Sequence, residues 1–232
     1  MAQELIVARA TRALAVAGLF DMHGHISVRE GDVLYVNDRA RSRIAVRPRD
    51  IARVRISDGR TLRGSPPSET PLHLAVYRAR PEAGSVAHFH PLYATAFAVA
   101  GRPLVTAYDA GAFFGREVPV FDDPDLIRSD AQGRAMVEAM GTAAAVLLRG
   151  HGVVVWTGDV PSCVVASIYL EESARRLAAT IPLGEPRSFS DEELRRVRAS
   201  AWQPAVIAKV WSDALERARH AGALEDLPED ED

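Results

Sequence analysis

Two histidines separated by one residue are the first feature of this sequence that could do chemistry. His88 and His90 lie in the segment SVAHFHP (85–91), and the residues before them are typical of a β-strand. Side chains two positions apart on a strand project from the same face, so both imidazoles could bind one cation. They could also do no more than line a polar groove, because the pattern His-x-His is common.

A third histidine, His151, stands between Gly150 and Gly152 and joins two apolar segments. Flanking glycines allow a sharp turn and leave room for the ring, although an exposed turn histidine would have the same neighbours. Three imidazoles without cysteine partners differ from a closed structural zinc site, in which thiolates usually complete the ligand set. The combination favours an open, catalytic metal site.

A carboxylate and a fourth histidine share one predicted helix over residues 68–80, for which Ser68 is the expected N-cap. Glu69 stands in its first turn, and His73 follows four residues later on the same face. A carboxylate in this position is stabilised by the helix dipole and is free to bind a metal or to act as a base or acid. It could also serve only to complement the dipole. For His73 a local hydrogen bond is favoured over direct metal ligation.

The elements that must position these residues follow from periodicity and turn residues. Residues 3–17 predict a helix that ends at Gly18. Four short β-like segments separated by turn residues then predict an antiparallel meander. They are HISVR (25–29), VLYVN (33–37), RIAVR (43–47) and VRIS (54–57).

Beyond the 68–80 helix, strands and helices alternate, which predicts a layered α/β chain. Strands are expected at 85–89, 104–107, 117–121, 143–150 and 152–156, and helices at 91–100, 130–140 and 161–180. A capping box from Ser190 to Glu193 predicts the start of a C-terminal helix that contains Trp202 and Trp211.

The composition is that of an ordinary globular protein, because 47% of the 232 residues are hydrophobic and 25% are charged. This excludes disordered, collagenous and disulfide-framework proteins. The 28 basic residues against 31 acidic ones give a net charge of −3, so no cationic field exists for nucleic acid or an acidic membrane. A small-molecule partner is the better expectation.

The ends of the chain and its cysteine add three expectations. Arg9 and Arg12 interrupt the apolar pattern of the first helix, which argues against a signal peptide or membrane span and favours a cytoplasmic protein. Cys163 is the single cysteine and is expected to be a small buried residue. No composition break divides the chain, so we expect one domain over 1–225 and a solvated acidic tail over 226–232.

Taken in order, these motifs resemble the class II aldolase/adducin family over about residues 5–180. The motifs that carry the resemblance are GHISVR (24–29), Ser68-Glu69 with His73, HFHP (88–91), LRGHG (148–152) and YLEESA (169–174). The resemblance implies a three-layer α/β/α sandwich around a mainly antiparallel sheet, assembled as a homotetramer with active sites between subunits. It also implies one divalent ion per subunit, Zn or Mn, bound by His88, His90 and His151. Glu69 would be the catalytic acid/base and could reach the metal.

Two departures separate this chain from the sugar-phosphate aldolases of that family. His25 replaces the Asn that those enzymes usually have, and AVRPRD (45–50) replaces a Thr-Pro-Ser-Gly segment that holds phosphate. Small hydroxyls suit a phosphate, whereas an Arg fork suits a planar carboxylate. With VFDDPDLI (120–127), these departures are more similar to the decarboxylase branch. Its members act on hydroxylated aromatic or pyridine dicarboxylates, such as 3,4-dihydroxyphthalate or 3-hydroxy-2-methylpyridine-4,5-dicarboxylate.

The resemblance therefore predicts a decarboxylase in which the metal stabilises an enolate-like charge and Glu69 or His25 protonates the ring carbon. The remaining predicted substrate contacts are Arg29 or Arg47 to a second carboxylate, with Ser68 and His73 beside them. One alternative is an aldolase or epimerase that acts on a sugar phosphate or small hydroxy acid, and its activity would depend on phosphate. Another is a non-enzymatic adducin-like scaffold, which would have no need of the metal triad.

Overall fold

The computed structural model describes residues 2–228, and its centre is an eight-stranded β-sheet. The strands of this sheet are β1 (His25–Glu30), β2 (Val33–Asn37), β3 (Ile51–Arg55), β4 (Thr61–Arg63), β5 (Ser85–Phe89), β8 (Val120–Phe121), β9 (Ala145–Leu148) and β10 (Gly152–Thr157). They lie in the order β4-β3-β2-β1-β5-β10-β9-β8, and neighbours are antiparallel except for the parallel pair β8–β9. A separate pair is formed by β6 (Leu104–Val105) and β7 (Glu117–Val118). The expected mainly antiparallel sheet is confirmed.

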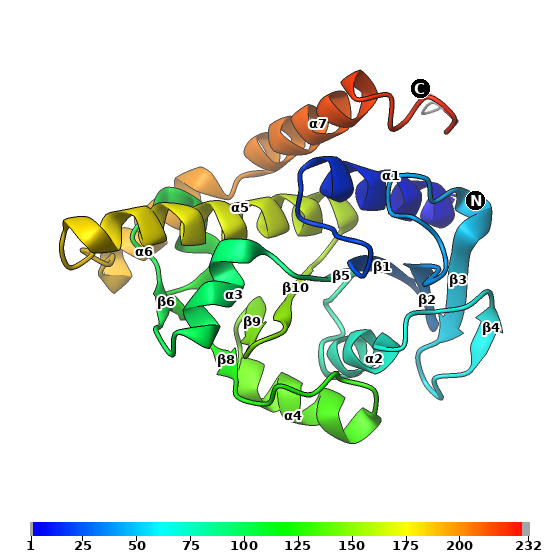
Figure 1. The fold of residues 1–232 in the computed structure, drawn as a ribbon, viewed down its shortest axis with the longest axis horizontal. Helices are drawn as coiled ribbons and strands as arrows, with labels where there is room; N and C mark the ends of the chain where they lie inside the picture. The colour runs from blue at the N-terminus through cyan, green and yellow to red at the C-terminus, as the bar shows by residue number, and fades with distance from the viewer. Residues whose placement is uncertain (1, 229–232) are drawn as a thin grey trace.

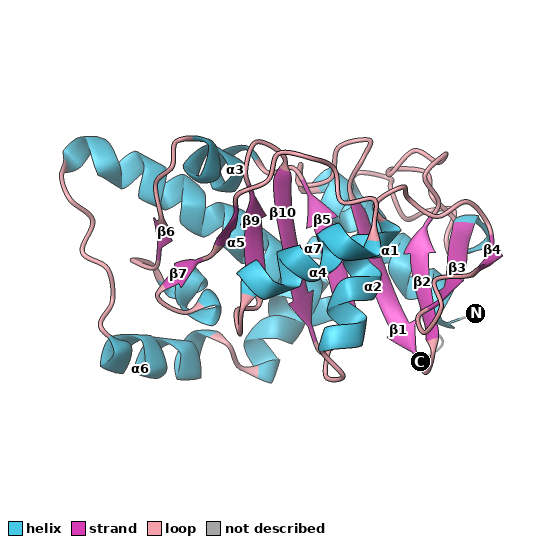
Figure 2. Cartoon of the chain, turned by 90° about the horizontal axis from the view of Figure 1, so that it is seen from below, coloured by secondary structure: helices cyan, strands magenta, loops and turns pink. Residues whose placement is uncertain are grey.

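Helices cover both faces of the sheet. They are α1 (Ala2–Val16), α2 (Thr70–Ala79), α3 (Leu92–Val99), α4 (Asp130–Met140), α5 (Val160–Thr180), α6 (Asp191–Ala201) and α7 (Pro204–His220). Figure 1 shows α1, α5 and α7 on one side of the strands and α2 and α4 on the other. In Figure 2 the molecule is seen from the α2 and α4 side, with the strands behind these helices. The expected α/β/α sandwich is confirmed.

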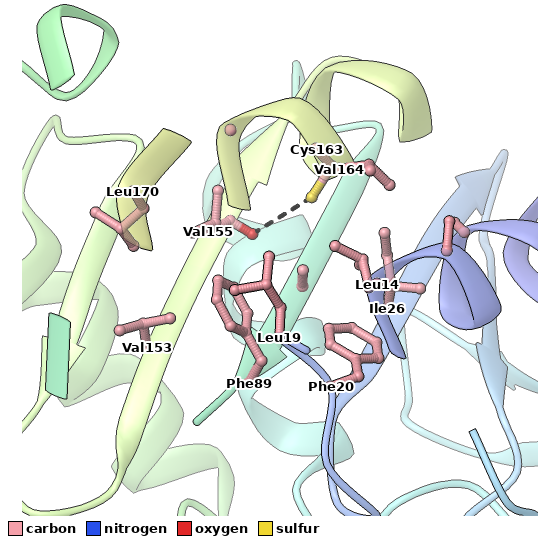
Figure 3. Packing of buried hydrophobic residues seen from close by; sticks show 14 of the residues in the cluster. Leu14, Leu19, Phe20, Ile26, Phe89, Val153, Val155, Cys163, Val164 and Leu170 are labelled. Carbon is pink, nitrogen blue, oxygen red and sulfur yellow. Dashed lines mark hydrogen bonds between the residues drawn. The ribbon is translucent and has the colours of Figure 1, made fainter. Parts of the chain in front are cut away.

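The alternation of side chains along the central strands sends apolar and polar residues to opposite faces. Ile26, Phe89 and Val155 enter the large core that also contains α1 and α5 (Figure 3). On each strand the residues next to these three point to the opposite face, which α2 covers. His25, next to Ile26, and His88, next to Phe89, therefore lie on the α2 side of the sheet. Cys163 of α5 is buried in the large core as predicted, and burial raises the pKa of its thiol to about 12.

The segment RIAVR (43–47), predicted as a strand, is a loop, so the prediction is wrong there. The Arg43 side chain ties this loop to the residues before it. Its buried guanidinium donates hydrogen bonds to the backbone carbonyls of Gly24, Asp38 and Arg41, which satisfies those carbonyls without a further strand. The third strand begins at Ile51 after a short 3-10 turn and therefore lies earlier than the predicted VRIS (54–57).

The C-terminal helix predicted from Ser190 is two helices in the structure. The capping box is confirmed, because Ser190 Oγ accepts from the N–H of Glu193 and the Glu193 carboxylate accepts from the N–H of Ser190. Pro204 restricts the residue before it to an extended backbone, so α6 ends before it and α7 starts there. No helix within residues 2–228 has both the length and the apolar character of a membrane span.

The start of the acidic tail is held against the domain. Leu227 is buried, and the Asp226 carboxylate pairs with Arg12 on α1 and with Arg47, whose Nε lies 2.8 Å from Asp226 Oδ2. Arg12 is buried, and a buried charge requires a partner of opposite charge, which Asp226 provides. The prediction of a solvated tail is wrong for Leu227, whereas Asp226 is exposed but held by its two ion pairs. The part of that tail from residue 229 onward lies outside the described residues.

We expect Asp226→Asn to lower the free energy of unfolding by about 1 kcal/mol at neutral pH, because the carboxylate is partly exposed and solvent screens its ion pairs. The hydrogen bond from Arg12, with that from Arg47, lowers the pKa of Asp226 from 3.8 to about 2. A depressed folded-state pKa gives stability that is present above the unfolded-state value and is lost as the pH falls from 3.8 to about 2.

Urea denaturation at neutral pH and near the lower limit of this window measures the effect. The difference between wild type and variant should shrink at low pH. Asp213→Asn, which removes an exposed ion pair within α7, is the matched control. Equal midpoints for Asp226→Asn and wild type at neutral pH would contradict the prediction.

Candidate active site

The predicted site residues converge at one end of the central strands. In the antiparallel order, the start of β1, the end of β5 and the start of β10 lie at the same end of the sheet. His25 and His88 are direct partners across the β1–β5 pair, and His88 is opposite Val154 of β10. His90 directly follows the last residue of β5, and His151 directly precedes the first residue of β10. The sheet register therefore brings together histidines that are far apart in the sequence.

His88, His90 and His151 form a compact cluster, as predicted. The ring centroids of His88 lie 4.8 Å from those of His90 and His151, and the other two rings are 5.2 Å apart. One nitrogen from each ring lies within 4.8 Å of the others. Such a spacing is suited to three ligands of a single ion.

Unpartnered nitrogens within the cluster fit a bound cation. His88 Nδ1 donates to Val153 O at 2.9 Å, so its Nε2 carries the lone pair. That Nε2 and both ring nitrogens of His151 are buried without a hydrogen-bond partner in the described part of the chain. Burial lowers the pKa of His88 to about 3, so its imidazole is neutral at physiological pH and can bind a metal.

Both glycines beside His151 have the local roles that the sequence predicts. Gly150 has a φ of +69°, which the turn between β9 and β10 requires. Gly152 lets the strands approach closely, because a Cβ there would lie 2.4 Å from Phe89 O and 2.8 Å from the His90 ring. A larger residue at Gly152 would displace the His90 side chain.

Glu69 points its carboxylate into the histidine cluster. It occupies the N-cap position of α2, in place of the predicted Ser68, but its side chain does not cap the helix. Oε1 accepts from the N–H of Ile127 at 3.1 Å, and Oε2 lies 3.5 Å from His151 Nε2. Burial alone would raise the pKa of Glu69, but the contacts with His151, His88 and the Ile127 N–H lower it. Glu69 is therefore an ionised carboxylate held by the VFDDPDLI segment.

Asp21 is a site residue that the sequence analysis missed. Its carboxylate lies 3.1 Å from His90 Nδ1 and accepts the backbone N–H groups of His23 and Gly24. Burial opposes ionisation, but these donors outweigh it and the pKa of Asp21 is lowered. An ionised Asp21 holds the proton of His90 on Nδ1 and leaves Nε2 free for a metal.

We expect Asp21→Asn to weaken metal binding about tenfold, because the amide can still accept hydrogen bonds but no longer orients His90 with a negative charge. Competition with a chromophoric chelator measures the affinity. Asp58→Asn, which changes another aspartate that accepts backbone N–H groups in a turn, is the matched control and should leave the affinity unchanged. An unaltered affinity for Asp21→Asn would remove Asp21 from the site.

His73 lies behind His25 and not in the open site. Its Nε2 is 2.7 Å from His25 Nδ1, and its Nδ1 is 2.8 Å from Ser27 Oγ. Both ring nitrogens are thus occupied and the side chain is fully buried. The favoured local hydrogen-bonding role is confirmed, and the predicted substrate contact of His73 is wrong.

The predicted arginines are engaged elsewhere in this subunit. Arg29 lies four residues beyond His25, about 13 Å along β1, and donates to the carbonyls of Gly31 and Tyr77. Arg47 pairs with Asp226. The structure does not bring either guanidinium to the histidine cluster. Ser68 is exposed beside Glu69, so its substrate contact stays a prediction.

Arg43 is the arginine that does reach the site, and the sequence analysis gave it no role. Its Nε donates to the carbonyl of Gly24, the residue before His25. Arg43 thereby fixes the backbone that enters β1. A buried arginine is visible in a sequence only as one more charged residue, so no local signal identifies it.

Similarity to known proteins agrees with this geometry. Residues 6–178 match the Class II Aldolase and Adducin N-terminal domain. The chain is 38% identical to a 3,4-dihydroxyphthalate decarboxylase of Rhodococcus jostii, over 78% of this chain and 81% of that protein. It is 35% identical to a 3,4-dihydroxyphthalate decarboxylase of a Terrabacter species, over 75% of this chain and 79% of that protein.

Solved structures show the same fold at lower identity. The L-fuculose 1-phosphate aldolase from Glaciozyma antarctica superposes with a TM-score of 0.81 at 19% identity, over 98% of this chain and 92% of that one. The sequence match, the sandwich and the histidine cluster agree. This chain belongs to the class II aldolase and adducin family.

Proposed function

We propose that this protein is a metal-dependent decarboxylase of a hydroxylated aromatic or pyridine dicarboxylate, with 3,4-dihydroxyphthalate as the first substrate to test. The observation that carries the proposal is the position of His25, which lies opposite His88 and within reach of Glu69. Sugar-phosphate members of the family usually have an Asn there. The relatives named as decarboxylases support the same assignment.

His88, His90 and His151 would hold the ion, and Glu69 lies close enough to join them. A bound divalent ion would supply positive charge beside the substrate oxygen on which negative charge develops. The unpartnered nitrogens of His88 and His151 support this assignment. The proposal includes one ion per subunit, with Zn or Mn as the first candidates to test, and a set of imidazole and carboxylate ligands is compatible with either.

Glu69 is the group that moves the proton. As an ionised carboxylate it takes the proton of the substrate's ring hydroxyl. When the bond to the departing carboxyl group breaks and carbon dioxide leaves, the electron pair stays on the ring carbon and Glu69 returns the proton to that carbon. The N–H of Ile127 holds the carboxylate in place during both transfers.

The test is carbon dioxide release, with the product identified by mass spectrometry, from metal-reconstituted protein. The panel contains 3,4-dihydroxyphthalate, the pyridine dicarboxylate and several sugar phosphates. Chelator-sensitive release from an aromatic diacid is the expected result. Cleavage or epimerisation of a sugar phosphate, without release from either diacid, would contradict the proposal and support the aldolase or epimerase alternative. A protein that binds no divalent metal and turns over none of these compounds would support the scaffold alternative.

We further propose that the sites lie between subunits of a homotetramer. Three exposed apolar side chains lie within two positions of the site residues in sequence: Met22 next to Asp21, Ile44 next to Arg43, and Leu92 two positions after His90. Apolar groups in such positions are typical of surfaces that another chain covers. Light scattering after size exclusion tests the assembly. The cytoplasmic location stays a prediction, and cell fractionation tests it.

A further inference from the structure

A chain of buried hydrogen bonds runs from His25 into the space between the sheet and α2. His25 Nδ1 lies 2.7 Å from His73 Nε2, and His73 Nδ1 lies 2.8 Å from Ser27 Oγ. Ser27 Oγ in turn lies 2.9 Å from the hydroxyl of Tyr77. His73 and Ser27 are fully buried, and Tyr77 is 1% exposed. Water therefore does not reach the chain to reverse its hydrogen bonds.

The buried end of the chain fixes the direction of every bond in it. In the described part of the structure, Ser27 Oγ is the hydrogen-bond acceptor available to the Tyr77 hydroxyl. A buried hydroxyl that donates to nothing is strongly unfavourable, so Tyr77 donates to Ser27. Ser27 has Val86 O as a second neighbour, but at 3.4 Å this contact is longer than the one to His73. Ser27 therefore donates to His73 Nδ1.

The direction of these hydrogen bonds determines which nitrogen carries the proton in each of the two imidazoles. A neutral ring carries one proton, so His73 accepts on Nδ1 and holds its proton on Nε2. His73 Nε2 donates to His25 Nδ1, and His25 must hold its own proton on Nε2. With the two imidazole bonds reversed, Ser27 Oγ would accept from both Tyr77 and His73 and could donate only to Val86 O, at the longer distance of 3.4 Å, so the direction that starts at Tyr77 is favoured.

We propose that Tyr77, Ser27 and His73 are positioning residues that fix His25 as the tautomer with its proton on Nε2. In this tautomer His25 presents an N–H to the site and has no lone pair there for a metal. His25, Glu69 and His88 also have a ligand atom each within 4.8 Å of one another, as an alternative metal site would need. The tautomer excludes His25 from that role and leaves His88, His90 and His151 as the imidazole ligands.

The same direction assigns His25 a hydrogen bond to a substrate oxygen and not the transfer of a proton to carbon. If a neutral His25 gave up its Nε2 proton, the ring would become an anion unless His73 donated its own proton to His25 Nδ1, and that relay would run back through Ser27 to the Tyr77 hydroxyl. Burial raises the pKa of that hydroxyl, which opposes its ionisation. This revises the expectation that His25 protonates the ring carbon. The role toward substrate rests on the proposed function, whereas the tautomer does not.

The test is a long-range proton–nitrogen NMR correlation on Zn-loaded protein with ¹⁵N-labelled histidines. The signals of His25 are identified by their loss in His25→Asn. We expect a protonated-type shift at His25 Nε2 and an unprotonated-type shift at Nδ1. A protonated Nδ1 in the wild type would overturn the proposal, whatever substrate the enzyme takes.

Tyr77→Phe removes the donor that starts the chain. We expect it to populate the other His25 tautomer and to lower kcat/KM for the substrate about tenfold, with unchanged metal content. Tyr35→Phe is the matched control, because its part-buried hydroxyl donates to Glu30 instead. Ser27→Ala interrupts the chain without altering the Tyr77 ring and repeats the test if Tyr77→Phe does not fold. Unchanged His25 signals in a folded variant would overturn the proposal.

The NMR result separates this proposal from the proposed function. If 3,4-dihydroxyphthalate is not a substrate but His25 has the expected tautomer, the function alone fails. If the substrate is turned over but the tautomer is absent, the positioning chain alone fails.

Discussion

Glu69→Gln is expected to lower kcat by about 10²- to 10⁴-fold, with metal content near that of the wild type. The amide preserves the size of the side chain and its contact with the Ile127 N–H, but it cannot accept and return a proton. The ionised state matters because neighbouring donors hold the pKa of Glu69 below its usual value. Turnover of the diacid and metal analysis of the same preparation measure the two effects.

The metal content of Glu69→Gln distinguishes a metal ligand from a group that only transfers a proton. Glu82→Gln, at an exposed position before β5, is the matched control and should leave both quantities unchanged. A large loss of metal in Glu69→Gln would make Glu69 a ligand first and a proton carrier second. Retained turnover in Glu69→Gln would remove Glu69 from the chemistry.

His88→Ala is expected to abolish activity and to weaken metal binding by more than about 100-fold, beyond the loss that an outer-sphere partner causes. His88 is the central ring of the cluster, and its Nδ1–H is committed to Val153 O. Its Nε2 is therefore aimed at the site. Because burial keeps the pKa of His88 near 3, protons do not compete with a metal for this nitrogen at neutral pH.

Equilibrium dialysis followed by elemental analysis measures the loss of metal. His220→Ala, at the exposed end of α7, is the control for the removal of an imidazole. Treatment of the wild type with a chelator should reproduce the inactivity of His88→Ala, and added metal should restore activity to the treated wild type alone. Full metal content in His88→Ala would show that the cluster is not the metal site.

Features encoded by short-range patterns could be predicted from the sequence. The composition of SVAHF (85–89) predicts a strand, and the two-residue period of a strand places His88 on the same face as Val86, toward α2. The capping box at Ser190 requires only residues three positions apart. The grouping of His88, His90 and His151 came from motif order, and the structure brings the three rings together.

Features that depend on contacts between distant segments could not be predicted. The predicted strand at 43–47 is a loop, in which the Arg43 guanidinium is buried against carbonyls of distant residues such as Gly24. Asp21 orients His90 from a position 69 residues away. Asp226 is drawn to the domain by Arg12, although its own neighbours are those of a solvated tail. In each case the position of a charged side chain is set by a contact with a residue far away in the sequence, and no local pattern identifies that residue.

The hydrogen bond between His88 and Val153 joins residues 65 positions apart, and that between His25 and His73 spans 48. Long-range strand pairings of this kind form slowly during folding, because the intervening chain must first be closed into loops. The histidine cluster therefore does not exist in any partly folded intermediate that lacks the β5–β10 pairing. An ion bound by this cluster would therefore favour the chain with its paired sheet over the unfolded chain, and removal of the ion would lower the stability of that pairing.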